Sequence, residues 1–328
     1  MTLSNNYLKR FSLIVTFLLA LLITLTALSC GSTYINIFRY FSLEPLMQEI
    51  IIMRLMRVII AFTVGGALSV AGAGYQAILR NVLADPFILG ISGGASVGAA
   101  VAIILGISFL GFFTLPLFAF AGSLVVLSLV LLMSKGDGIE YSSNIILSGV
   151  ILSTITSSLL MFIISYLNMS QLNSITWWLL GNLEPENWSL IVVSVVIAFA
   201  GTFTLFLYGR EINACSMGEE VGYYLGISPV KLAFLVLGIS SLMTACVVSI
   251  SGIIGFVGLI IPHIVRKFIG SDHRKLIPYS LVCGGLYLVI CDTIARTVVH
   301  PQILPVGVVT AIIGGPVFLW ILNRRLKG

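Results

Sequence analysis

The stretch RLMRVIIAFTVGGALSVAGAGYQAILRNVLADPFILGISGGASVG, from Arg54 to Gly98, decides the fold. It begins with two arginines three residues apart, a spacing that puts both on one face of a helix. A long apolar segment rich in Gly and Ala follows, and it ends at the polar corner Arg80-Asn81 and the break Asp85-Pro86. We interpret the stretch as a helix that crosses a membrane, a turn at the far face, and a segment that returns.

The composition excludes an ordinary soluble domain. Of the 328 residues, 59% are hydrophobic and 9% are charged, whereas a soluble domain carries about 25% charged residues. The sequence therefore predicts an all-α polytopic membrane protein. The chain has no Walker A phosphate-binding motif, so we expect no ATP site of that kind. Its five cysteines include no CxxC pair and indicate neither disulfides nor a metal, and we expect no cofactor.

Apolar runs of about 20 residues, the length that spans a bilayer, recur along the whole chain. We predict one transmembrane domain over residues 1–328 with about ten spans. The expected spans cover residues 11–30, 51–79, 86–110, 111–133, 143–166, 190–208, 232–250, 252–269, 276–295 and 303–322. The first run is long for a signal peptide, although residues 27–30 loosely resemble a lipoprotein cleavage site. We prefer a first membrane span, because everything downstream is membrane too.

The placement of positive charge predicts the orientation. Ten spans put both termini on one side of the membrane. With cytoplasmic termini, the 17 Lys and Arg residues lie inside except for Arg39, Arg54, Arg57 and Arg296. The positive-inside rule therefore predicts a multi-pass protein of the cell membrane with both termini in the cytoplasm.

The third and eighth expected spans are short and interrupted by Gly or Pro. They occupy comparable places in two halves, about residues 54–166 and 231–322. An odd number of spans separates them, so the halves would be inverted repeats. Paired broken helices in inverted repeats indicate the transport path of many transporters.

The arginines expected on the outer side have two interpretations. Arg54, Arg57 and Arg296 can bind carboxylates of a docking protein through bidentate hydrogen bonds. They can equally reach lipid phosphates or pair within the chain. Asp292 lies four residues before Arg296 and can neutralise it. An intramembrane carboxylate often marks an ion path, but with Arg296 so near we favour a structural ion pair.

The longest polar interruption, residues 209–231, lies on the inner side in this topology. It combines Glu211, Glu219 and Glu220 with several glycines and a cluster of apolar and aromatic residues. Short helices with an exposed apolar face are typical of a docking element for a cytoplasmic partner. The alternative is a loop that packs on itself. No Ser/His/Asp or Cys/His arrangement points to an enzyme.

Four blocks of sequence carry a family resemblance. They are RLMR at residues 54–57, GAGYQAILRNVLADPFILGISGGASVGA at 72–99, GIIGFVGLIIPHIVRKFIGSDHRKLIP at 252–278 and CDTIARTVVHPQILPVGVVTAIIGGPVFLWIL at 291–322. The chain resembles the FecCD-type permeases, the membrane subunits of ABC importers for iron–siderophore complexes, haem and cobalamin. Met56 and Val82 depart from the pattern, since Pro is common at both positions.

The resemblance implies a type II ABC importer with ten helices in each permease subunit, like the cobalamin importer permeases. It implies a homodimer, or a pair with a close paralogue, in membrane lipid, with the pathway on the twofold axis. Two cytoplasmic ABC ATPase subunits and an extracytoplasmic substrate-binding protein complete the assembly, with no nucleic-acid partner. ATP hydrolysis then belongs to the partner, and the permease itself has no catalytic residue or metal site.

The resemblance also assigns roles to positions of this chain. Arg54, Arg57 and Arg296 match the positions that dock the binding protein. The ATPase-coupling helices in residues 209–231 match at Met217, Gly218, Glu219, Glu220, Val221, Gly222 and Leu225. The inner constriction of the pathway matches at Asn81, Leu83, Ser142 and Ser143.

The expected function is ATP-driven import of an iron–siderophore complex or a similar metal chelate, such as haem or cobalamin. Two other classes stay open on the residues alone. A proton- or sodium-coupled transporter would use Asp292 and the broken helices, and a receptor or structural subunit would move no substrate. The sequence does not identify the cargo.

Overall fold

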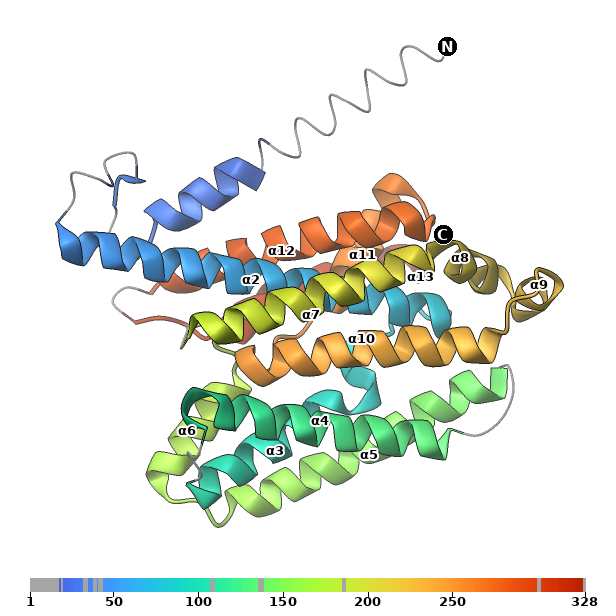
Figure 1. Cartoon of the computed structure of the whole chain (residues 1–328), viewed down its shortest axis with the longest axis horizontal. Coiled ribbons are helices and arrows are strands. Elements are labelled where there is room, and N and C mark those ends of the chain that lie inside the picture. The colour runs from blue at the N-terminus through green and yellow to red at the C-terminus, as the bar shows by residue number, and fades with distance from the viewer. Residues whose placement is uncertain are drawn as a thin grey trace.

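The computed structural model describes residues 18, 20–31, 35–37, 40, 44–106, 110–134, 139–184, 187–299 and 302–326. Within these ranges helices are the only regular secondary structure, and there is no strand. The predicted all-α class is therefore confirmed. The long helices lie side by side along the long axis of the molecule (Figure 1).

The long helices follow the order of the expected spans. A helix over Ala20–Ser29 comes first, and most of the remainder of the first expected span lies outside the described residues. The others are α2 (Pro45–Ile78), α3 (Ile91–Leu105), α4 (Thr114–Met133), α5 (Ile139–Ile164), α7 (Trp188–Leu207), α10 (Pro229–Ser251), α11 (Val257–Ile269), α12 (His273–Thr297) and α13 (Val306–Leu326).

Six of these helices, within the described ranges, are long and apolar enough to cross a membrane: α2, α4, α5, α7, α10 and α12. Ala20–Ser29, α3 and the apolar part of α13 are shorter apolar helices. The prediction of about ten spans is thus approximate. The helices of the predicted third and eighth spans are also short, because the 3-10 turn η2 (Pro86–Leu89) and left-handed Gly90 delay α3, and residues 252–256 delay α11.

Helix α2 lies at the centre of the packing and contacts α7, α10, α11 and α12. Glycines make these contacts close, as is common between membrane helices. A methyl group at Gly65 would overlap the carbonyl oxygen of Gly284 on α12. One at Gly72 would overlap the carbonyl of Gly258 on α11. From Arg54 to its end, α2 extends about 36 Å at ~1.5 Å per residue, enough to cross a hydrocarbon core of about 30 Å.

The Gly-rich segment after Pro86 packs closely against its neighbour. A methyl group at Gly94 would lie 2.5 Å from the carbonyl oxygen of Gly122 on α4. One at Gly98 would overlap the carbonyl of Phe118. The small residues of α3 therefore bring its backbone against α4.

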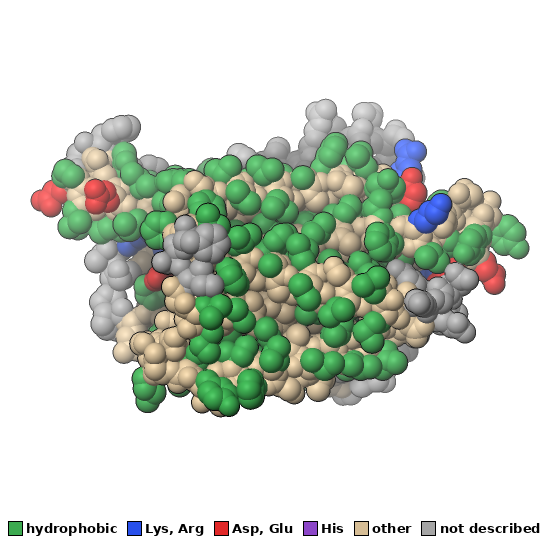
Figure 2. All heavy atoms as spheres, turned by 60° about the horizontal axis from the view of Figure 1, so that its bottom comes forward, with side chains coloured by type: hydrophobic (Ala, Val, Ile, Leu, Met, Phe, Trp, Pro, Cys, Tyr) green, Lys and Arg blue, Asp and Glu red, His purple; other side chains and the backbone are tan. Residues whose placement is uncertain are grey.

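Short helices stand at the two ends of the molecule. At one end, α6 (Met169–Leu179) begins at a capping box between Asn168 and Gln171. At the other end lie two short helices, α8 (Gly209–Met217) and α9 (Glu219–Tyr224). Apolar side chains cover the middle of the face in Figure 2, and the visible charged side chains gather toward both ends. Following the orientation predicted from the positive charges, we call the end with α6 the outer end and the end with α8 and α9 the inner end.

We expect Gly72→Ala to destabilise the protein by about 1–3 kcal/mol, because the carbonyl of Gly258 cannot move away without displacing α11. The midpoint of thermal unfolding in detergent should fall. Gly238→Ala is the matched control, since nothing lies within 4 Å of a methyl group at that helical position. Equal midpoints for the two variants would show that the contact between α2 and α11 is not tight.

Candidate functional site

The three arginines predicted to dock a partner come together at the outer end. Arg54 and Arg57 on α2 and Arg296 on α12 line one hollow of about 340 Å³, together with Glu184. The remaining lining residues are Gly31, Ile50, Met53 and Ile303. Each arginine is largely buried. The guanidinium groups that line the hollow are therefore already held in place by contacts within the protein.

Asp292 holds two of these arginines through both of its carboxylate oxygens. Arg57 Nε donates a 2.8 Å hydrogen bond to Oδ1. Arg296 Nε lies 2.9 Å from Oδ2, in a charge contact without an aligned hydrogen bond. The predicted pairing of Asp292 with Arg296 is confirmed, and Arg57 joins it. Because Asp292 is itself buried, breaking this group would leave charge without compensation.

The end of the first helix accepts hydrogen bonds from the same cluster. Arg54 Nη1 donates to the carbonyls of Leu28 and Ser29, each at 3.0 Å. Arg296 Nη2 donates to the carbonyl of Ala27 at 3.2 Å. These carbonyls belong to the C-terminal turn of Ala20–Ser29, where helix carbonyls lack partners and the helix dipole favours a cation. The arginines therefore fasten the first helix to α2 and α12.

Glu184 is a member of the site that the sequence analysis did not identify. Its Oε1 lies 3.7 Å from Arg57 Nη1, and its side chain is 58% exposed. Glu184 also lines two further hollows of about 360 and 560 Å³, both beside Trp177 and Asn182. It is distant in sequence from both α2 and α12, so no local spacing signals its contact with Arg57.

At the inner end, α8 and α9 form a compact pair fixed to the end of α2. Arg80 Nη2 donates to the carbonyl of Cys215 at 3.1 Å and lies 3.3 Å from Glu219 Oε1. Gly218 takes a positive φ of 153° between the two helices. A methyl group at Gly222 would lie 2.8 Å from Cys215 Sγ. Of the residues predicted to couple to an ATPase, Glu219 and Gly222 thus have internal packing roles.

A polar cluster fixes α8 to the start of α12. Asn213 Nδ2 donates to Asp272 Oδ1 at 2.8 Å, and the backbone N–H of His273 donates to Asn213 Oδ1 at 2.8 Å. Hydrogen bonds from Arg274 and then from Asn213 hold the pKa of the Asp272 carboxyl well below its ordinary value. The carboxylate therefore stays ionised at any physiological pH.

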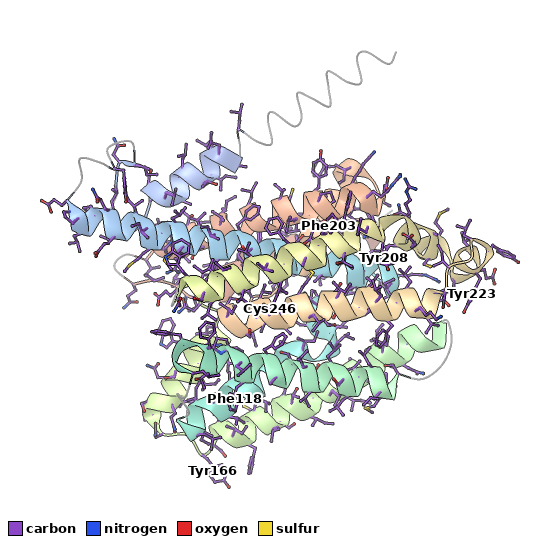
Figure 3. The ribbon with its side chains drawn as sticks, in the orientation of Figure 1. Phe118, Tyr166, Phe203, Tyr208, Tyr223 and Cys246 are labelled. Atoms are coloured by element: carbon purple, nitrogen blue, oxygen red, sulfur yellow. The ribbon has the colours of Figure 1, made fainter. Side chains whose placement is uncertain are left out.

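The exposed surface of α8 and α9 is largely apolar. We call Met217, Val221, Tyr223, Tyr224 and Leu225 the coupling patch. Met217 is 80% exposed and Tyr224 is 90% exposed, and Tyr223 stands at the tip of the molecule in Figure 3. Glu220 is also exposed beside the patch. An apolar surface of this kind on a short polar-rimmed helix is typical of a protein interface.

The predicted constriction residues lie near the inner end but are only partly described. Asn81 Oδ1 accepts a 2.9 Å hydrogen bond from the backbone N–H of Leu83, within the turn that follows left-handed Arg80. Leu83 is exposed. Ser143 is exposed near the start of α5, which begins at the same end (Figure 1). The side chain of Ser142 lies outside the described residues.

Comparisons with known proteins agree along the chain. The FecCD transport family model matches residues 13–324. The uncharacterised ABC transporter permease protein YvrB of Bacillus subtilis is 40% identical over 318 residues, 92% of this chain and 90% of that protein. The cobalamin import system permease protein BtuC of Halobacterium salinarum is 38% identical over 274 residues, 83% of this chain and 72% of that protein.

A solved structure has the same fold. It is that of a metal-chelate type ABC transporter in an inward-facing conformation. The two chains share 30% of their sequence and superpose with a TM-score of 0.86, covering 96% of this chain and 99% of the other.

We expect Asp292→Asn to destabilise the protein by about 3–5 kcal/mol, because two buried guanidinium groups lose their shared counter-charge. The midpoint of thermal unfolding in detergent measures the effect. Glu184→Gln should change stability by less than about 1 kcal/mol, since the Glu184 side chain is 58% exposed and lies 3.7 Å from Arg57 Nη1. If both variants lost the same small amount, Asp292 would not be the centre of the cluster.

Proposed function

Because the chain belongs to the FecCD transport family, and is therefore the permease of a type II ABC importer for metal chelates, we propose that it carries an iron–siderophore complex or a similar chelate such as haem or cobalamin. One observation supports the proposal above the others. The same helix, α2, has a hollow lined by arginines at its outer end and a contact with the coupling patch helices at its inner end.

The outer hollow suits a partner that presents carboxylates. The planar guanidinium of arginine binds a carboxylate through two parallel hydrogen bonds. A guanidinium that is already held in place loses little conformational entropy when it binds. We therefore assign Arg54, Arg57 and Arg296 to docking of an extracytoplasmic substrate-binding protein. Their ion pairs within the chain are compatible with this role, because those contacts orient the guanidinium groups toward the hollow that they line.

The inner end suits an ATPase. The coupling patch offers apolar anchors of the kind that fill a cleft on a partner, and Arg80 ties α9 to the end of α2. Two cytoplasmic ABC ATPase subunits would close on ATP and move α8 and α9 with them. The permease would then alternate between outward and inward openings, and Asn81, Leu83, Ser142 and Ser143 would narrow the path at the inner end.

The assembly proposed here contains a second permease, either a second copy or a close paralogue. Helix α5 supports this assignment, since it exposes a row of large apolar side chains that a second permease or membrane lipid must cover: Leu147, Ile151, Ile155 and Phe162. The distribution of Lys and Arg supports cytoplasmic termini.

A transporter driven by an ion gradient is the weaker alternative. It would need a carboxylate that gains and loses a proton or binds a cation. Both oxygens of Asp292 face arginines instead. This arrangement favours a structural role for Asp292.

The proposal predicts that ATP drives chelate uptake and that the coupling patch transmits the movement of the ATPase to the permease. In proteoliposomes with the permease, its ATPase and its binding protein, uptake of an iron–siderophore complex should require ATP on the ATPase side. Met217→Ala with Tyr224→Ala should lower uptake at least tenfold, because apolar anchors carry most of such an interface, and should leave the unfolding midpoint unchanged.

Tyr166→Ala is the matched control, because Tyr166 is 70% exposed and lies at the outer end (Figure 3). It should transport as the wild type does. Uptake that follows an ion gradient without ATP would refute the ABC mechanism, and normal uptake by the double variant would refute the role of the coupling patch.

The docking role predicts that the affinity for the binding protein falls when the guanidinium groups are replaced by ammonium groups of the same charge. Arg54→Lys with Arg57→Lys should weaken capture of the binding protein about 10- to 100-fold, the effect of losing charge-assisted bidentate hydrogen bonds. Surface plasmon resonance on nanodisc-embedded permease measures the affinity. Arg210→Lys, at an exposed position on α8, is the control. Unchanged affinity in the double variant would contradict the assignment.

A further inference from the structure

We propose that Glu184 stands in for a docking carboxylate: it occupies Arg57 while the binding protein is absent and is displaced when the binding protein docks. This inference rests on the proposed docking function of the outer arginines. It assigns a positioning role to a residue between α6 and α7, and it links docking to the wall of the outer hollows.

The two carboxylates on Arg57 are held very differently. Asp292 is buried and accepts a 2.8 Å hydrogen bond from Nε. Glu184 lies 3.7 Å from Nη1 and is 58% exposed. An exposed ion pair is weak, whereas a buried pair is costly to break. A partner carboxylate that reaches Arg57 therefore replaces Glu184 and leaves Asp292 in place.

The position of Glu184 connects this exchange to the surrounding structure. Its backbone N–H donates to Asn182 Oδ1 at 2.9 Å, and the backbone N–H of Asn182 donates to the carbonyl of Ser251 at 2.8 Å. Gly181 takes a positive φ of 79° just before. Residues 181–184 are thus a short ordered segment. Asn182 fixes it to the end of α10, Leu183 is buried in the core to which α2 contributes, and the carboxylate of Glu184 contacts Arg57 on α2.

The same segment forms part of three hollows. Glu184 lines the arginine hollow and both of the hollows beside Trp177. Asn182 lines the latter two. When Glu184 leaves Arg57, the segment beside the arginine hollow loses its ion pair with α2. Docking of the binding protein thereby frees the carboxylate of Glu184 next to the place where cargo arrives, while Leu183 stays in the core.

The test compares docking affinities of three variants in the nanodisc-embedded importer. Glu184→Gln removes the competing charge, and Glu184→Asp keeps the charge but withdraws it from Arg57. Each should tighten binding of the binding protein about two- to fivefold, the range of an exposed ion pair. Glu49→Gln removes an exposed carboxylate from the same end of α2 and should have no effect.

Two patterns would overturn the proposal. Equal tightening by Glu184→Gln and Glu49→Gln, with none from Glu184→Asp, would mean that only the general electric field matters. Weaker docking of Glu184→Gln would mean that Glu184 supports the docking site instead of competing for it.

A second readout needs no binding protein. Hydrogen–deuterium exchange of the amides of residues 182–184 should be faster in Glu184→Gln than in the wild-type permease, because the segment has lost its ion pair with Arg57. Adding the binding protein to the wild type should accelerate the same amides. Unchanged exchange in the variant would overturn the proposal even if docking is normal. Failure of the wild type to capture the binding protein would instead refute the proposed docking function.

Discussion

The buried carboxylate of Asp292 is the contact on which the outer half of the molecule depends. It receives Arg57 from α2 and Arg296 from α12, and Arg296 together with Arg54 reaches the carbonyl end of the first helix. The first helix and α2 therefore meet α12, which is distant from both in sequence, at one charged point. Because Asp292, Arg57 and Arg296 are buried, the geometry of this group is strongly specified, since any member left alone would be a buried charge.

Along the rest of α2, close backbone contacts hold the neighbouring helices in place. The glycines at positions 65 and 72 let α12 and α11 approach to backbone distance. At the inner end, Arg80 attaches α9. The central helix α2 thus connects the arginine cluster at the outer end with the coupling patch at the inner end. Each of these two surfaces can bind a partner. This continuity makes α2 suited to connect events on the two sides of a membrane.

Local patterns predicted much of this architecture. Apolar runs indicated the order of the helices, and the four-residue spacing of Asp292 and Arg296 indicated their pairing. The capping box at Asn168 was visible in the sequence and would have placed α6. Contacts between distant segments were not accessible in this way. Arg57 and Asp292 are 235 residues apart, and Glu184 has no neighbour in sequence that reveals its contact with Arg57, because such contacts arise only from tertiary packing.

The sequence separation between Arg57 and Asp292 has a consequence for synthesis of the protein. The chain emerges from its N-terminus, so α2 enters the membrane long before α12 exists. An arginine inside a membrane helix is unfavourable by up to about 2.5–3.5 kcal/mol at the helix centre, and less near an end. The nascent chain must therefore tolerate Arg57 without its carboxylate partner until α12 arrives. The charged cluster at the outer end of the protein is therefore completed only after α12 has been synthesised.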